Sequence, residues 1–207
     1  MSAEIEHSCA CGDFSASLLD VSPRTVTRGV CYCKDCQAFA HYLGRADDIL
    51  DAAGGTTIHQ TAPSRIKITR GADRVAAMRL SARGLIRWFA DCCHSPIGNT
   101  PPARWFAFVG LIERKGQFDA AENDALGPPR FAVFTEHAER APDPQLKTPN
   151  PYLNLGPILA QVARERLAGR HRQTPFFQED GSFAAKPIVL SDAERDSLMS
   201  KIGSECQ

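Results

Sequence analysis

Three cysteines fall within six residues of this chain, in the order Cys31-Tyr32-Cys33-Lys34-Asp35-Cys36. Thiols this close together pair poorly as disulfides, but they suit one metal ion, because Zn²⁺ gathers thiolates at about 2.3 Å in a tetrahedron. Three ligands from this stretch, here named the central motif (Cys31, Cys33 and Cys36), leave a fourth position to be filled. A protein atom there would make the site structural, whereas water or a substrate there would allow chemistry.

Two further cysteine pairs, Cys9 with Cys11 and Cys92 with Cys93, lie next to predicted turns. With the central motif they account for seven of the eight cysteines, which random burial would scatter. A flat strand would hold Cys9 and Cys11 too far apart to share a metal, so the backbone must turn there, as Gly12 permits. The count fits two zinc sites, one of four thiolates and one of three. A single structural zinc with spare thiols, unrelated buried thiols, and a catalytic cysteine without metal are the alternatives.

The composition supports metal ligation rather than disulfides. At 207 residues, the chain can bury a core as one domain or as one domain with an appendage. Acidic and basic residues balance at 24 each, which gives no support for a nucleic-acid or membrane partner. The first residues lack an apolar signal segment, and no apolar run approaches the roughly 18 residues of a membrane span. We therefore expect a cytoplasmic protein, in which thiols stay reduced.

Alternating and β-branched runs predict about eight short strands, and hence a mainly β fold. A hairpin-type connection is predicted at Gly71-Ala72-Asp73, and a short helical turn over residues 37–43. The apolar run over residues 105–112 is interpreted as a central strand, with a helix as the alternative, because periodicity alone does not separate the two. The predicted strands cover residues 14–18, 25–30, 56–60, 64–69, 75–80, 85–90, 105–112 and 130–134.

The composition changes after about residue 140, where proline-rich linkers begin. We interpret residues 1–140 as a zinc-binding β domain and residues 141–207 as a linker and helical C-terminal extension packed on it. Helical spacing extends over residues 158–167, and Ser191 with Glu194 forms a capping-box pattern at the start of a last helix. Cys206, near the end of the chain, is given no role. The linkers lie at residues 141–144 and 148–151.

The order of the cysteine motifs resembles the glutathione-dependent formaldehyde-activating enzyme (GFA) family. Cys-x-Cys-Gly, Cys-x-Cys-x-x-Cys and a cysteine pair before Ser95-Pro96 follow one another over roughly residues 7–115. The resemblance implies a β-tent fold of short antiparallel strands with two zinc sites. It implies that Cys9, Cys11 and Cys93 hold a structural zinc, and that the central motif holds a three-thiolate zinc with an open position. The implied activity is that of a carbon–sulfur lyase, which condenses glutathione with formaldehyde to S-(hydroxymethyl)glutathione.

The third motif departs from the family pattern, which is Cys-x-x-Cys-Gly-Ser-Pro. Aligned on Ser95-Pro96, the second cysteine is Cys93, His94 replaces the glycine, and the first cysteine falls on Ala90. Either Cys92 or His94 must then complete the structural site, or that site has only three protein ligands; we favour Cys92. Neighbouring residues of a strand point to opposite faces, so Cys92 and Cys93 share a metal only where the backbone turns.

A mechanism can be stated as a hypothesis. A zinc at the central motif could bind an incoming thiol, such as glutathione, and keep it deprotonated, so that its sulfur attacks or releases a carbonyl carbon. His41 or His59 could move protons, and the side chains that could hold glutathione carboxylates are Arg65, Arg70 and Arg87. Each of these five residues also fits an ordinary structural or surface role.

The competing hypothesis is non-catalytic: a zinc-stabilised scaffold or protein-binding module, with the C-terminal extension as its docking surface. A fourth protein ligand at the central motif, without a neighbouring cleft, would favour the scaffold. An open position in a pocket would favour the enzyme. A redox or metal-buffering protein is a third possibility, which is disfavoured because thiolates held on structural zinc exchange poorly.

Overall fold

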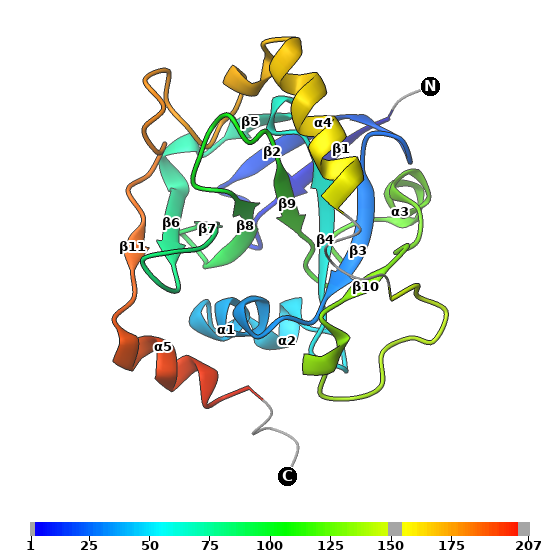
Figure 1. Ribbon diagram of the computed structural model, residues 1–207, viewed down its shortest axis with the longest axis vertical. Coiled ribbons are helices and arrows are strands. Elements are labelled where there is room, and N and C mark those ends of the chain that lie inside the picture. Colours follow the sequence, from blue (N-terminus) through cyan, green and yellow to red (C-terminus); the bar gives the residue numbers. More distant parts are fainter. Residues whose placement is uncertain (1–2, 149–154, 203–207) are drawn as a thin grey trace.

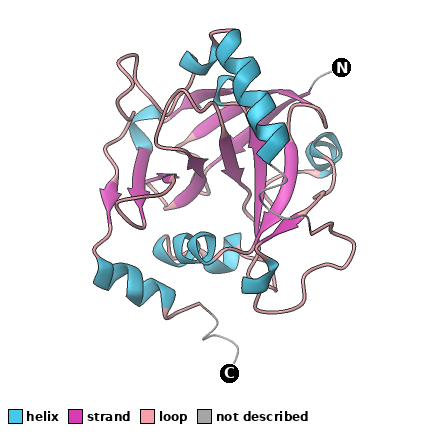
Figure 2. Cartoon of the chain, in the orientation of Figure 1, coloured by secondary structure: helices cyan, strands magenta, loops and turns pink. Residues whose placement is uncertain are grey.

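The computed structural model describes residues 3–148 and 155–202 of the chain. Within these two ranges the protein is mainly β, with eleven strands in two sheets and five α-helices (Figures 1 and 2). This confirms the predicted fold class. Residues 149–151 of the second proline-rich linker and Cys206 lie outside the described residues.

The two sheets differ in size and share no strand. The smaller is antiparallel, with β2 (Ser15–Val21) between β1 (Ala3–Ser8) and β5 (Ile66–Arg70). The larger is antiparallel except at its two edges, where β10 lies parallel to β3 and β11 lies parallel to β6. In spatial order, its strands are β10 (Ala132–Val133), β3 (Thr27–Cys31), β4 (Thr56–Thr61), β9 (Val109–Ile112), β8 (Ser95–Thr100), β7 (Ile86–Ala90), β6 (Val75–Arg79) and β11 (Ile188–Val189).

Short helices connect and cover these strands. The α-helices are α1 (Lys34–Tyr42), α2 (Ala46–Ile49), α3 (Ala120–Leu126), α4 (Leu155–Leu167) and α5 (Asp192–Met199). Four 3₁₀ turns are also present among the described residues: η1 (Pro63–Arg65), η2 (Ala72–Arg74), η3 (Thr135–His137) and η4 (Arg170–Arg172). Helix α1 lies below the larger sheet, on the side away from the smaller sheet (Figure 1). Helix α5 packs against α1.

The alternation of side chains along the strands gives the larger sheet two buried faces. On one face, Trp88 of β7 and Val109 of β9 pack against the smaller sheet. On the other, Phe89 and Ile112 pack against Phe39 of α1. The larger sheet therefore lies between the smaller sheet and α1. Because side chains alternate along a strand, Arg87, which precedes Trp88, also lies on the face toward α1.

The C-terminal extension contributes to the core as well as covering it. The rings of Phe176 and Phe177 lie 5.1 and 6.4 Å from that of Trp88, and β11 adds an edge strand to the larger sheet. The predicted capping box is confirmed, because Ser191 accepts from the backbone N–H of Glu194 while the Glu194 carboxylate accepts from that of Ser191.

The predicted strand over residues 105–112 is wrong in its first half. Only Val109–Ile112 forms a strand, and the preceding residues form turns and irregular backbone. Trp105 is 52% exposed and lies against the ring of Phe106 and the guanidinium of Arg166. A continuous apolar run can thus consist partly of a loop whose aromatic rings pack on one another.

The predicted hairpin connection at Gly71-Ala72-Asp73 is also wrong. The strands on its two sides belong to different sheets, because β5 pairs with β2 and β6 pairs with β7. The connection is the turn η2, which leads the chain from the smaller sheet to the larger one. The pairing of strands far apart in the sequence determines that β5 and β6 do not form a hairpin, and the local turn residues do not indicate this pairing.

Three observed strands have no counterpart in the sequence prediction: β1, β8 and β11. Strand β8 contains Pro96 and Gly98, which are residue types depleted in strands. Strand β11 has only two residues. Local composition was too weak a signal for either of them.

Candidate metal centres and the adjoining pocket

Two turns on different hairpins bring together the four-cysteine site, which consists of Cys9, Cys11, Cys92 and Cys93. The first two lie between β1 and β2, and the others lie between β7 and β8. The Sγ atom of Cys9 is 3.5 Å from that of Cys11 and 3.7 Å from that of Cys92. All four sulfur atoms lie within 4.8 Å of one another, so the group could hold a metal ion. Gly12 has φ +83°, which gives the turn that the Cys-x-Cys pair needs.

Hydrogen bonds fix the two turns relative to each other. The Ser95 hydroxyl accepts from the Ala10 N–H at 2.9 Å and lies 3.2 Å from the Cys93 sulfur. The Phe14 N–H donates to the Cys9 sulfur at 3.2 Å. Hydrogen bonds of this kind orient the sulfur atoms and are typical of thiols that bind a metal.

Of the two alternatives for the fourth ligand, Cys92 lies in the group and His94 does not. His94 is exposed, has φ 54°, and turns its ring against Phe89 at 6.0 Å. The left-handed backbone at His94 is the turn that lets the adjacent residues Cys92 and Cys93 face the same point.

The three-cysteine site (Cys31, Cys33 and Cys36) lies where β3 leads into α1. Cys31 ends the strand, Cys33 is the N-cap of the helix, and Cys36 lies in its first turn. The Cys36 and Cys31 sulfur atoms are 3.8 Å apart, and the three sulfur atoms lie within 4.8 Å of one another. This group could also hold a metal ion. No fourth Cys, His, Asp or Glu among residues 3–148 and 155–202 belongs to it.

Buried hydrogen bonds hold this stretch to the loop that follows β10. The Gln37 amide donates to the carbonyl of Tyr32 at 2.8 Å and to that of His137 at 3.0 Å. The Tyr32 hydroxyl donates to Asp51 at 3.1 Å. Backbone bonds between β3 and β10 add to this connection, and together they place η3 next to the cysteines.

Arg87 of β7 approaches the three-cysteine site from the larger sheet. Its side chain is 4% exposed, and its Nη1 atom lies 4.0 Å from the Cys36 sulfur and 3.3 Å from Asn99 Oδ1. Its guanidinium also lies 3.8 Å from the Asp35 carboxylate. Hydrogen bonds from the other two thiols, and then the charge of Arg87, hold the pKa of Cys36 well below its usual value.

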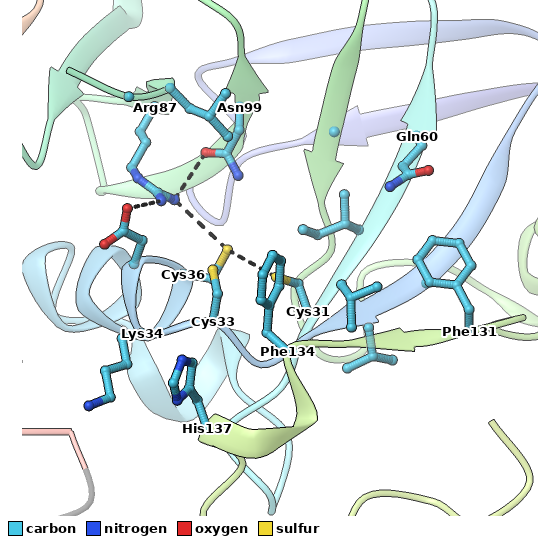
Figure 3. Close-up of a pocket in the computed structure, with 18 of the residues that line it drawn as sticks. Cys31, Cys33, Lys34, Cys36, Gln60, Arg87, Asn99, Phe131, Phe134 and His137 are labelled. Carbon is cyan, nitrogen blue, oxygen red and sulfur yellow. Dashed lines mark hydrogen bonds and ion pairs between the residues drawn. The ribbon is translucent and has the colours of Figure 1, made fainter. Parts of the chain in front are cut away.

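A cavity of about 530 Å³ opens beside the three cysteines, and Arg87, Asn99 and His137 line it with them. This volume falls within the roughly 300–1,000 Å³ of small-molecule sites. Figure 3 shows the cysteines between Arg87 and Asn99 on one side and Phe134 and His137 on the other. Most of the lining surface is apolar, and its apolar side chains are Val30, Ile58, Leu85, Phe108, Phe131, Val133 and Phe134.

Of the arginines and histidines proposed from the sequence as functional residues, only some lie near the three-cysteine site. Arg87 lines the pocket, whereas Arg65 lies 3.6 Å from Asp20 and Arg70 ends β5 in the smaller sheet. Of the two histidines, His41 lines a different cavity. His137, Asn99 and the aromatic wall were missed, because no motif marks them and only long-range pairing brings them to the cysteines.

His59 lies on the opposite face of β4 from the pocket, in a buried ionic cluster. Its Nε2 atom lies 2.9 Å from Glu113, which also pairs with Arg28 at 2.5 Å. Burial lowers the pKa of His59. Burial alone would raise the pKa of Glu113, but the hydrogen bond with His59 and the charge of Arg28 outweigh it, and the pKa is lowered. This cluster stabilises the fold and does not contact the cysteines.

The comparisons with known proteins give a family without a known activity. Residues 1–188 match a family of unknown function, DUF6151, and the chain belongs to this family. The match includes both cysteine sites and all the residues that line the pocket. No curated protein matches the chain. In the part of the chain that the structure describes, no helix is long and apolar enough to cross a membrane.

Proposed function

We propose that the protein is a zinc-dependent enzyme of the carbon–sulfur lyase type, similar to the GFA family, which acts on the adduct of a thiol with an aldehyde. Glutathione is the thiol that the sequence resemblance suggests. The proposal includes zinc in both cysteine sites, because sets of three or four thiolates in tetrahedral reach are the ligands that structural and catalytic zinc prefer.

One observation carries the proposal: the three-cysteine site borders a cavity and has no fourth protein ligand among the described residues. The four-cysteine site has its full set of ligands and borders neither of the two described cavities. A zinc with three protein ligands and an open position beside a pocket is the arrangement of catalytic sites. A scaffold would need no such opening.

Zinc bound by Cys31, Cys33 and Cys36 would keep an incoming thiol in its thiolate form at neutral pH. In the addition direction, the sulfur attacks the carbonyl carbon, a carbon–sulfur bond forms, and the carbonyl oxygen takes up the proton that the thiol released. The lyase direction reverses these steps. No oxidant or reductant is needed, because the thiol adds across the carbonyl group.

The residues around the cavity suit these steps. Arg87 donates to Asn99 Oδ1, which turns the amide nitrogen of Asn99 toward the pocket, where it can donate to the carbonyl oxygen (Figure 3). The positive charge of Arg87 offsets the net negative charge that three thiolates leave around a divalent cation. His137, on the other side of the pocket, is the residue that we assign to proton transfer.

The test is Cys33→Ser in the full chain, with metal content and thiol binding measured on protein purified without added zinc. The wild-type protein should contain two zinc equivalents and bind glutathione or another small thiol. The variant should fold, keep one equivalent and lose thiol binding. Unchanged thiol affinity in the variant would reject the mechanism, and a single equivalent in the wild type would leave the three-cysteine site without its metal.

A further inference from the structure

We propose that the pocket beside the three-cysteine site selects a thiol with an uncharged, apolar body, such as an aryl or alkyl thiol, over a peptide thiol with two carboxylates, such as glutathione. This choice of substrate class rests on the proposed function and concerns the same site. Three features of the cavity support it: its wall, its charged groups and its volume.

The wall of the cavity is built from apolar side chains of several separate segments. Phe131 and Phe134 flank β10, Ile58 comes from β4, and Phe108 precedes β9. The ring of Phe131 packs against Gly29, where a Cβ atom would come within 2.5 Å of it. Burial of a hydrocarbon group against such a surface is favourable, whereas an ionised group would find no hydrogen-bond partner or opposite charge there.

The positive charges at the cavity are poorly placed for carboxylates. Arg87 is already engaged by Cys36, Asn99 and Asp35, and its side chain is 4% exposed. Lys34 is exposed, and Figure 3 shows its side chain directed away from the cysteines. Apart from the cysteines, the other polar lining side chains in the described ranges are the carboxylate of Asp35, two amides and an imidazole, none of which carries a permanent positive charge.

Glutathione brings two carboxylates and an ammonium group, so its binding would take charges out of water without matched partners. Carboxylates moved into an apolar site lose hydration that must be replaced by fixed cations and hydrogen-bond donors. The cavity of about 530 Å³ has room for more than the reacting carbon and sulfur atoms. The rest of the ligand therefore lies against the aromatic wall, where a neutral body fits best.

The test compares two thiols on the full chain loaded with Co²⁺ in place of zinc. Dissociation constants for 2-phenylethanethiol and for glutathione are measured by calorimetry and by the thiolate-to-cobalt absorption band. We expect 2-phenylethanethiol to bind about tenfold tighter, because its ring buries apolar surface. Equal or tighter binding of glutathione would overturn the substrate class but leave the proposed function intact. Failure of both thiols to bind would overturn both.

A pair of variants tests the wall itself. Phe134→Ala should lower the affinity for 2-phenylethanethiol about fivefold and leave that for glutathione unchanged. Leu159→Ala, at a half-exposed position of α4 that does not line the cavity, should change neither. Metal content reports whether each variant keeps its sites. An equal loss of affinity for both thiols in Phe134→Ala would contradict selection by the apolar wall.

Discussion

The two cysteine sites of this protein combine burial and ligand number in opposite ways. The four-cysteine site includes the buried Cys9, the exposed Cys11 and the half-buried Cys92 and Cys93, and its four sulfur atoms could complete a tetrahedral set of ligands. The three-cysteine site is deeper, with Cys31 7% and Cys36 5% exposed, but one ligand position has no protein donor among the described residues. Burial alone therefore does not indicate which site is closed; the number of ligands and the neighbouring cavity do.

Their positions in the fold explain the difference. The four-cysteine site ties together two turns, with Cys9 and Cys92 separated by 83 residues, so its metal would link the two sheets. The three-cysteine site is formed within six residues, and its backbone is already held by β3, β10 and Gln37. A metal in the first site would stabilise the fold, whereas under the proposed function a metal in the second would take part in chemistry.

The largest expected effect separates the two sites by stability. Cys92→Ser should remove one metal equivalent and lower the free energy of unfolding by about 3 kcal/mol or more, because a long-range link is lost. Cys33→Ser should also remove one equivalent but lower stability by less than about 1 kcal/mol. Urea unfolding of both variants, with metal analysis, measures this. Equal losses of stability would show that the sites do not differ in role.

A second prediction concerns Arg87, which contacts one site and not the other. Arg87→Gln should leave both metal equivalents in place, weaken thiol binding about tenfold, and shift the pH profile of binding upward, because a positive charge beside the sulfur is lost. Arg28→Gln is the matched control, since Arg28 pairs with Glu113 on the opposite face of the larger sheet. The control should lose stability but bind thiol normally. Equal thiol affinity in the two variants would show that Arg87 has no role in thiol binding.

The smallest expected effect is a pH dependence that neither site causes. Burial lowers the pKa of His59 below its ordinary value of 6.5, and the pKa of Glu113 also lies below its ordinary value of 4.5. Both groups thus bind protons more weakly in the folded state. Their stabilising contribution is complete at neutral pH, begins to fall below about pH 6.5, and falls further below about pH 4.5.

Unfolding of metal-free protein between pH 7 and pH 4 removes the contribution of the metal, because proton competition for thiolates also removes metal in acid. Burial lowers the pKa of His7 to about 3, so His7 contributes to the same slope, and the share of His59 is the difference between the wild type and a His59 variant. His59→Gln should flatten the upper part of the stability curve. An unchanged slope in that variant would show that other groups cause the acid sensitivity. The comparison of the two metal sites could then be made only at neutral pH.

Particular elements show how far sequence reasoning reached. The cysteine spacing predicted three local clusters, the family resemblance implied that the first and the last of them share one site, and the structure brings the same seven cysteines together in those two groups. The capping box of α5 was predicted correctly, because it depends on residues three positions apart. The predictions for the connection after β5 and for the first half of residues 105–112 were wrong, because both depend on which distant segments pair as strands.

By itself, the sequence determined the mainly β class and the three local clusters of cysteines, because alternation and close spacing are local properties. Only the tertiary structure decided that Cys92 rather than His94 joins its group, and that Arg87 rather than Arg65 faces the three-cysteine site. Only it placed the apolar wall beside the three-cysteine site. The physical reason is that the direction of a side chain depends on the face of its strand and on the neighbours of that strand, and both are set by contacts between residues far apart in the chain.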